Sequence, residues 1–286
     1  MTKSILETIL EPGALSVVFQ PIFDIRDGIR RVDSVEALVR GPRGTHFTRA
    51  DILFDYVRRK KAEASVDQRC LITICDAMTC LPEDVRVNVN VHASTLGQSP
   101  AFVDYFRRYT KKCSLQPHRF TIEIVEHAPT CNASQLTNSI AQLREYGSRI
   151  ALDDVGLGQS NYRMMLDCHP DYFKLDAYFV RDLSRDTKRR AVVESLVTLA
   201  RALNSAVVAE AVSNQEDLFY LAKLGVHLVQ ANMLCAAQTI EELQKMGHLV
   251  GASPDPGDRT AHASARLNPL EGCGRDLELA ISPCRV

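Results

Sequence analysis

The sequence predicts an α/β fold, a modified TIM-like (β/α)8 barrel with an antiparallel first strand. Two observations lead to this prediction. Eight short apolar segments alternate with segments of helical periodicity between residues 15 and 247, and alternating strands and helices in this number are typical of a closed barrel. The Asp27-Gly28 pair, a frequent hairpin turn, separates the first two apolar segments. These two strands should therefore be antiparallel.

The expected elements follow one another in a regular order. A short helical pattern ends at Pro12-Gly13, and the two hairpin strands cover residues 15–25 and 31–40. Helical periodicity between residues 49 and 80 predicts two helices. Strand-and-helix units make up the rest of the barrel. Their strands are expected over residues 85–92, 119–126, 149–155, 171–176, 206–212 and 227–231, and their helices near 100–112, 133–146, 160–167, 187–203, 214–223 and 239–247.

Length and composition are those of one large globular domain. The chain has 286 residues, of which 45% are apolar and 24% charged, as expected for an α/β barrel with a sizeable core. We assign residues 1–250 to the barrel. Residues 251–286 are rich in Pro, Gly, Ala, Ser and Arg and lack sustained periodicity, so we expect a disordered tail there.

Charge and cysteine content exclude several classes of protein. A net charge of -1 gives no support for binding to a nucleic acid polymer. No apolar run approaches the roughly 18 residues that a membrane-spanning helix needs, and the N-terminus lacks the apolar core of a secretory leader. The nine cysteines have no metal-ligand spacing and are typical of reduced thiols. These features predict a soluble, cytoplasmic protein.

A predicted buried strand that ends in two adjacent acids is the first indication of chemistry. Three apolar residues, 150–152, precede Asp153 and Asp154, and Gly156 and Gly158 follow. Neighbouring carboxylates repel unless a positive charge compensates them, so a hard metal ion is an economical explanation. Considered alone, the pair also fits an ordinary Asx-rich turn after a strand.

Several other predicted strands carry polar residues where a barrel core favours Val or Ile. Buried carboxylates are unfavourable unless they are paired or bind a metal, and oxygen donors suit Mg²⁺ or Mn²⁺. Two ions bridged by Asp153 would activate water for phosphodiester hydrolysis, with Lys174 adding positive charge near that water. Taken singly, Asn90 could satisfy a backbone group and Lys174 could neutralise Asp176. The full set is Glu36, Asn90, Glu123, Asp153, Asp154, Lys174, Asp176, Glu210 and Gln230.

These residues resemble the motifs of the EAL-domain cyclic di-GMP phosphodiesterase family over roughly residues 5–248. A three-residue motif means little alone, but several motifs in the family's order are a specific signal. They are Gln20-Pro21-Ile22, Glu36-Ala37-Leu38 with Arg40, Asn90, the Glu-x-x-Glu of Glu123 and Glu126, Asp153-Asp154, the Lys-x-Asp of Lys174 and Asp176, Glu210, and Gln230.

The resemblance implies a phosphodiesterase that uses two Mg²⁺ or Mn²⁺ ions to open cyclic di-GMP to linear pGpG. It implies that Lys174 and Glu210 position or activate the water. It also implies that Glu126 anchors the loop after Asp154, through which the family links dimerisation or a sensor to activity, so a homodimer and a regulatory protein partner are expected. The implied metal ligands are Glu36, Asn90, Glu123, Asp153 and Asp154, and the implied substrate contacts are Gln20, Leu38, Arg40, Asp176 and Gln230.

The sequence departs from the family pattern at positions that support the motifs. Residues 155–160 read Val-Gly-Leu-Gly-Gln-Ser where the family has Phe-Gly-Thr-Gly-Tyr-Ser, and Ala211 and Ser213 replace a glycine and a glutamate. A loosened support can slow an enzyme that keeps its metal ligands. Two alternatives therefore remain. One is a module that binds cyclic di-GMP or a protein partner without turnover. The other is a barrel phosphodiesterase acting on lipid headgroups, which only the fold supports.

Overall fold

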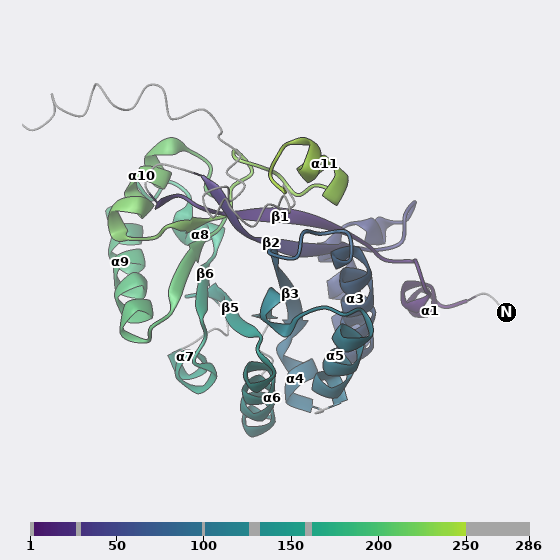
Figure 1. The fold of residues 1–286 in the computed structure, drawn as a ribbon. Coiled ribbons are helices and arrows are strands. Elements are labelled where there is room, and N and C mark those ends of the chain that lie inside the picture. Colours follow the sequence, from purple (N-terminus) through teal and green to yellow (C-terminus); the bar gives the residue numbers. More distant parts are fainter. Residues whose placement is uncertain (1–2, 27–29, 99–100, 126–131, 158–161, 250–286) are drawn as a thin grey trace, which may run out of the picture.

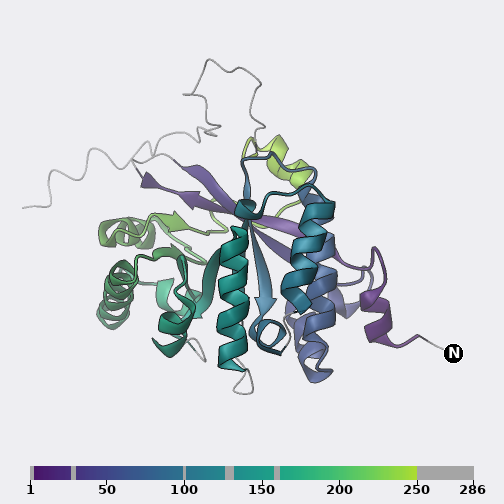
Figure 2. The same cartoon turned by 60° about the horizontal axis from the view of Figure 1, so that its bottom comes forward.

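Eight strands form a closed barrel in the computed structural model, with helices around its outside (Figures 1 and 2). The structure describes residues 3–26, 30–98, 101–125, 132–157 and 162–249. Neighbouring strands in the barrel are also neighbours in the sequence, and the last strand pairs with the first. The predicted α/β barrel is confirmed, whereas the predicted tail lies outside the described residues.

The strands and helices alternate as predicted. The strands are β1 (Ser16–Asp24), β2 (Arg31–Arg40), β3 (Arg86–His92), β4 (Phe120–Val125), β5 (Arg149–Val155), β6 (Tyr172–Leu175), β7 (Ala206–Ala209) and β8 (Leu228–Val229). The α-helices are α1 (Ile5–Leu10), α2 (Ala50–Arg59), α3 (Glu63–Met78), α4 (Ala93–Gln98), α5 (Ala101–Lys112), α6 (Ala133–Tyr146), α7 (Tyr162–Cys168), α8 (Ala177–Val180), α9 (Thr187–Ala202), α10 (Gln215–Leu224) and α11 (Ile240–Lys245), with 3-10 turns η2 (His46–Thr48) and η3 (Pro117–Arg119).

Strand β1 runs antiparallel to both of its neighbours, β2 and β8. All the other neighbouring strands pair in parallel. The predicted antiparallel first strand is therefore confirmed, although the Asp27-Gly28 turn itself lies outside the described residues. The antiparallel pair places Gln20 directly opposite Glu36, which matters for the site described below.

Helix boundaries follow local capping chemistry. The side chain of Asn132 accepts a hydrogen bond from the backbone N–H of Gln135 at the start of α6, and Gly147 ends that helix with φ +112°. Asn214 and Gly225 do the same for α10. The asparagine before each helix accepts a hydrogen bond from a backbone N–H of the first turn. The left-handed glycine after each helix donates its own N–H to carbonyl groups of the last turn.

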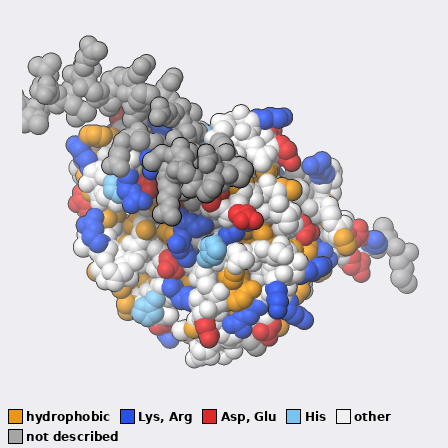
Figure 3. Space-filling model, in the orientation of Figure 1, with side chains coloured by type: hydrophobic (Ala, Val, Ile, Leu, Met, Phe, Trp, Pro, Cys, Tyr) orange, Lys and Arg blue, Asp and Glu red, His pale blue; other side chains and the backbone are white. Residues whose placement is uncertain are grey.

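The core lies between the strands and the surrounding helices. In one contact of this layer, the Phe106 ring of α5 meets the Phe120 ring of β4 edge-on, with centroids 5.1 Å apart. Acidic and basic side chains are interspersed over the face in Figure 3, as expected for a net charge of -1. In the part of the chain that the structure describes, no helix is both long and apolar enough to cross a membrane.

Candidate active site

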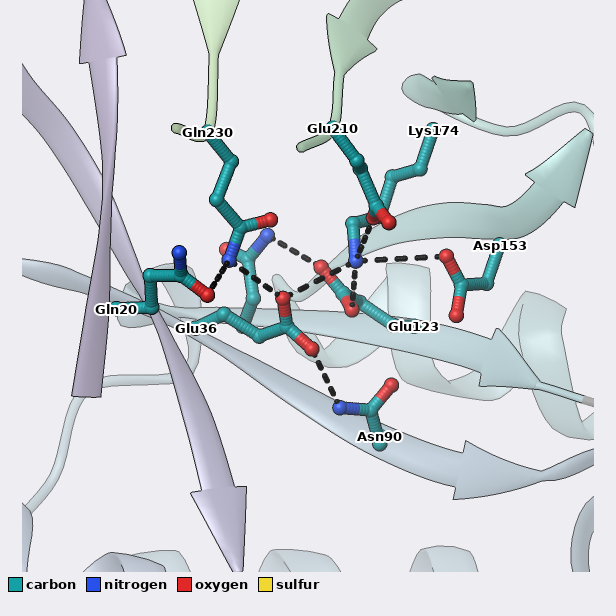
Figure 4. Close-up of polar contacts among 9 residues, drawn as sticks. Gln20, Glu36, Asn90, Glu123, Asp153, Lys174, Glu210 and Gln230 are labelled. Atoms are coloured by element: carbon teal, nitrogen blue, oxygen red, sulfur yellow. Dashed lines mark hydrogen bonds and ion pairs between the residues drawn. The ribbon is translucent and has the colours of Figure 1, made fainter. Parts of the chain in front are cut away.

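The strand register brings polar residues that are distant in sequence to one place inside the barrel. Gln20 of β1 pairs with Glu36 of β2, Glu36 pairs with Asn88 of β3, and Asn90 of β3 pairs with Glu123 of β4. Residues directly opposite one another on paired strands project from the same face of a sheet. Here that face is the barrel interior, as the close-up in Figure 4 shows.

Lys174 of β6 lies at the centre of these polar residues with 1% of its side chain exposed. Four acidic side chains surround its ammonium group (Figure 4). We call these acids the carboxylate cluster. The Nζ atom lies 2.6 Å from Oε1 of Glu210, 2.7 Å from Oε2 of Glu123, 3.3 Å from Oε2 of Glu36 and 3.4 Å from Oδ1 of Asp153.

Side-chain amides hold Glu36 in place. Asn90 donates from Nδ2 to Oε1 of Glu36 at 2.8 Å, and Gln230 donates from Nε2 to Oε2 of Glu36 at 2.9 Å. The Nε2 atom of Gln230 also lies 3.1 Å from Oε1 of Gln20. The network therefore joins β1, β2, β3 and the residue after β8, which come from the two ends of the chain, to the cluster around Lys174.

The cluster holds more negative charge than Lys174 can offset. Burial raises the pKa of Glu210 to about 8, repulsion from Asp153 and Glu36 adds to this effect, and Lys174 opposes it. Burial also raises the pKa of Glu123 well above its usual range. Without a further cation, the cluster would therefore retain protons on part of its carboxylates near neutral pH.

Glu36 and Lys174 shift in the directions that keep them charged. Burial opposes ionisation of Glu36, but Lys174, Asn90 and Gln230 outweigh it and hold the pKa of Glu36 below its ordinary value. Burial likewise opposes the charge on Lys174, but the surrounding carboxylates, with Asp153 the strongest, raise the pKa of Lys174 well above its ordinary value. Lys174 is therefore an ammonium group at any physiological pH.

The donor chemistry of the cluster suits a divalent cation. Carboxylate and amide oxygens are the ligands that Mg²⁺ and Mn²⁺ prefer, and the excess negative charge would favour such ions. As they stand, however, the described residues include no group of three or more His, Cys, Asp or Glu side chains that could hold a metal ion. The four acids contact the Lys174 ammonium group, which supplies the positive charge among them.

A cleft of about 280 Å³ opens beside the cluster. Its walls include Leu38 and Arg40, both predicted to contact substrate, as well as Asp153 and Asp154. Asp154 is exposed and has φ +50°, so the chain turns sharply where β5 ends. The cleft therefore gives a ligand access to the acidic residues from outside the barrel.

Among the predicted site residues that the structure describes, Asp176 has no contact with this network. The side chain of Asp176 accepts a hydrogen bond from the backbone N–H of Tyr178 at 2.6 Å and caps helix α8. Glu126, the predicted loop anchor, lies outside the described residues. The structure brings together the remaining predicted residues, either in the network around Lys174 or on the walls of the cleft.

The structure adds two amides that the sequence interpretation missed. Asn88 donates from Nδ2 to Oε1 of Glu123 at 2.6 Å, and Asn232 accepts at Oδ1 from Nε2 of Gln20 at 2.9 Å. The alternation of β3 gives a signal for the first residue, because Asn88 and Asn90 are two positions apart and share a face. Asn232 follows β8 in a segment without periodicity, and we find no signal for it in the sequence.

Comparison with known proteins identifies the family. A model of the family described as the EAL domain matches residues 3–236. The chain belongs to the EAL domain family. The resemblance inferred from the sequence motifs is therefore confirmed.

Relatives within the EAL domain family carry phosphodiesterase names. The chain is 32% identical over 166 residues to the probable cyclic di-GMP phosphodiesterase PdeA of Escherichia coli strain K12, an alignment that covers 57% of this chain. The chain spans only 22% of the length of that relative.

Solved EAL domain structures share the fold. The PaMucR phosphodiesterase in complex with c-di-GMP superposes with a TM-score of 0.74 at 25% identity, covering 83% of this chain and 97% of that structure. BlrP1 of Klebsiella pneumoniae, in a manganese and cyclic di-GMP complex, gives a TM-score of 0.70 at 26% identity, covering 80% of this chain and 57% of that structure.

Proposed function

We propose that this EAL domain chain is a divalent-metal-dependent phosphodiesterase that hydrolyses cyclic di-GMP to linear pGpG. The observation that carries the proposal is the carboxylate cluster around Lys174, with its excess of negative charge, next to a cleft that opens to solvent. Names and ligands of the relatives, among them a manganese and cyclic di-GMP complex, support the same substrate and cofactor class.

Oxygen donors at the inner end of the cleft would hold two Mg²⁺ or Mn²⁺ ions. When bound, such ions polarise a phosphoryl oxygen and lower the pKa of a bound water, which makes water a nucleophile near neutral pH. Glu210 would complete the site beside Lys174, 2.6 Å away. The donors that we assign to the ions are Glu36, Asn90, Glu123, Asp153 and Asp154.

Lys174 and Glu210 would act on the attacking water. The Lys174 ammonium group stays protonated because carboxylates surround it, so it can donate hydrogen bonds to the water or to a phosphate oxygen. Glu210 would accept a proton as the water oxygen bonds to phosphorus. The bond from phosphorus to the 3′ oxygen breaks, that oxygen takes a proton, and the phosphate remains on the 5′ oxygen of pGpG.

The remaining predicted residues would bind the substrate or regulate its hydrolysis. We assign nucleotide contacts to residues that reach the cleft or its inner end, while Asp176, which caps α8, and the loop anchor Glu126 are assigned on the family motifs alone. A homodimer, a regulatory protein partner and a cytoplasmic setting belong to the proposal on the same ground. The assigned nucleotide contacts are Gln20, Leu38, Arg40, Asp176 and Gln230.

Product analysis tests this proposal. The purified chain is incubated with cyclic di-GMP and Mn²⁺ and its products are separated by chromatography, in parallel with Glu36→Gln and with Glu241→Gln, a control on the exposed side of α11. We expect pGpG from the parent and the control, and at least a hundredfold lower rate from Glu36→Gln. Equal rates from both variants would contradict the assignment of the site.

A second function, binding of cyclic di-GMP without turnover, is favoured by one feature. Ala211, directly after Glu210, has φ +50°, a region that costs a residue with a Cβ roughly 1–2 kcal/mol. Strain beside a residue that must act on water could weaken catalysis and leave binding intact. Saturable binding of the nucleotide, without pGpG formation at any Mn²⁺ or Mg²⁺ concentration, would identify a receptor.

A further inference from the structure

The wall of the cleft carries basic side chains as well as acidic ones, and the acidic ones include Glu63 and Asp67. Arg40, at the end of β2, and Arg58, in the last turn of α2, line the same cleft as Glu36 and Asp153. Partial burial lowers the pKa of Arg40 from its ordinary value, although an arginine remains charged. Apolar side chains, among them Phe54, form other parts of the cleft wall.

The proposed substrate has two anionic groups to match this charge distribution. Cyclic di-GMP contains two phosphodiesters, each with one negative charge. The phosphodiester to be cleaved must lie beside the ion donors and Lys174. The second phosphodiester would be attracted to the guanidinium groups of the cleft wall.

We infer that Arg58 contacts the second phosphodiester, the one that is not cleaved, and thereby selects substrates that carry two phosphates. This inference rests on the proposed function. Arg58 lies outside the motifs that carry the family resemblance, and its assignment depends on its position in the cleft wall. Arg40 would share the contact, since both arginines line the same cleft.

The neighbouring residue Arg59 provides a matched control. Both arginines follow Asp55 on α2, but Arg59 pairs with Asp55 at 2.6 Å, whereas the distance from Arg58 to Asp55 is 3.7 Å. The side chain of Arg59 is 76% exposed, against 39% for Arg58. Exposed pairs of this kind contribute little to stability, so variants at both positions should fold.

Steady-state kinetics on two substrates test the inference. The variants are Arg58→Ala, Arg58→Lys and Arg59→Ala, and the substrates are cyclic di-GMP and bis(4-nitrophenyl) phosphate, which has a single phosphodiester. For cyclic di-GMP we expect Arg58→Ala to raise KM about tenfold with kcat within twofold, and Arg58→Lys to raise KM less. For bis(4-nitrophenyl) phosphate, both Arg58 variants should match the parent, and Arg59→Ala should match it on both substrates.

Two results would overturn the inference while leaving the proposed function intact. One is an active parent for which Arg58→Ala and Arg59→Ala behave alike on cyclic di-GMP. The other is an equal loss on both substrates, which would mean that Arg58 supports the site as a whole.

If the parent chain does not hydrolyse cyclic di-GMP, calorimetry tests the inference through binding. Cyclic di-GMP is titrated into the chain in the presence of Ca²⁺. A Kd about tenfold weaker for Arg58→Ala than for the parent and Arg59→Ala would support the inference for a receptor, whereas no binding by the parent would overturn both proposals.

Discussion

Lys174 determines the charge balance of the site. Its ammonium group lies within 3.4 Å of a carboxylate oxygen from each of four acids, contributed by β2, β4, β5 and the residue after β7. Ionised groups in a partly dry interior are stable only when they are paired. The structure of the metal-free site therefore depends on this one residue more than on any single acid.

Replacing Lys174 with methionine should destabilise the metal-free chain. Lys174→Met removes the positive charge and leaves four acids facing one another, so we expect the free energy of unfolding in EDTA to fall by about 3–5 kcal/mol. Urea denaturation followed by circular dichroism measures this change. Lys245→Met, at an exposed position on α11, should change it by less than about 0.5 kcal/mol, and an equal loss in the two variants would refute the explanation.

Glu210 should make the metal-free chain less stable at alkaline pH. Its pKa of about 8 in the folded chain lies above its ordinary value of 4.5, so the folded state binds this proton more tightly than the unfolded state does. The resulting stability is fully present below about pH 4.5 and is lost as the pH rises through about 8. The pKa of Asp67 is also raised, to about 6, so the interval from pH 6.5 to 8 reduces the contribution of Asp67.

The measurement is the melting temperature in EDTA across that interval. It should fall in the parent, and the fall should be smaller in Glu210→Gln and in the parent with saturating Mn²⁺, which favours the ionised carboxylate. Glu241→Gln should follow the parent. A parent curve that is flat or rising between pH 6.5 and 8 would show that the cluster does not retain protons in the folded state.

At the residue scale, the sequence predicted which residues belong to the site better than it predicted which of them contact one another. Acids and amides in predicted strands, such as Glu36 and Gln230, stand out because apolar residues are expected there, and the structure brings most of them together. Asn88 belongs to the same network but reads as one polar residue in an alternating strand. Which acids surround Lys174 depends on the barrel register, which no local pattern specifies.

At the scale of elements, the ends of the strands carry backbone strain next to the site. Ala211 follows β7 with φ +50°, and Gly156 follows β5 with φ +93°. A Cβ atom on Gly156 would lie 2.9 Å from Cε2 of the buried Phe179 ring. The glycine suits its position for two reasons, conformation and space, whereas the alanine tolerates an unfavourable conformation.

Exchanging these residue types should change stability in opposite directions. We expect Ala211→Gly to raise the free energy of unfolding by up to about 1 kcal/mol, because glycine adopts positive φ without the cost that a Cβ imposes. Gly156→Ala should lower it by about 1–3 kcal/mol, through strain and the contact with Phe179. Urea denaturation of the two variants provides the test, and destabilisation by Ala211→Gly would contradict the account of strain.

The sequence predicted long elements better than short ones. Helix α6 and strand β2 have the predicted bounds because periodicity and caps extend over ten or more residues. Helices α4 and α8, of six and four residues, were missed. Strands β7 and β8 end earlier than predicted, after four and two residues, and single bonds such as Gln230 N–H to Ala209 C=O continue the pairing.

At the scale of the whole molecule, closure of the barrel assembles the site. Gln20 and Gln230 are 210 positions apart in the chain, yet their side chains lie 3.1 Å from one another because β8 returns to pair with β1. Alternation of strands and helices predicted the closed barrel, and the hairpin signal predicted its antiparallel start. Distances between side chains on different strands could not be predicted, because they depend on how eight separate segments close into one sheet.

We propose that the excess negative charge at the inner end of the cleft serves a metal-dependent hydrolysis. The most direct test is the initial rate of cyclic di-GMP opening by the parent chain as Mn²⁺ is raised from zero in a chelator-treated solution. We predict no measurable pGpG without the ion and a rate that rises to saturation with it. A rate that is independent of Mn²⁺, or no pGpG at any concentration from a folded chain that binds the nucleotide, would contradict the claim.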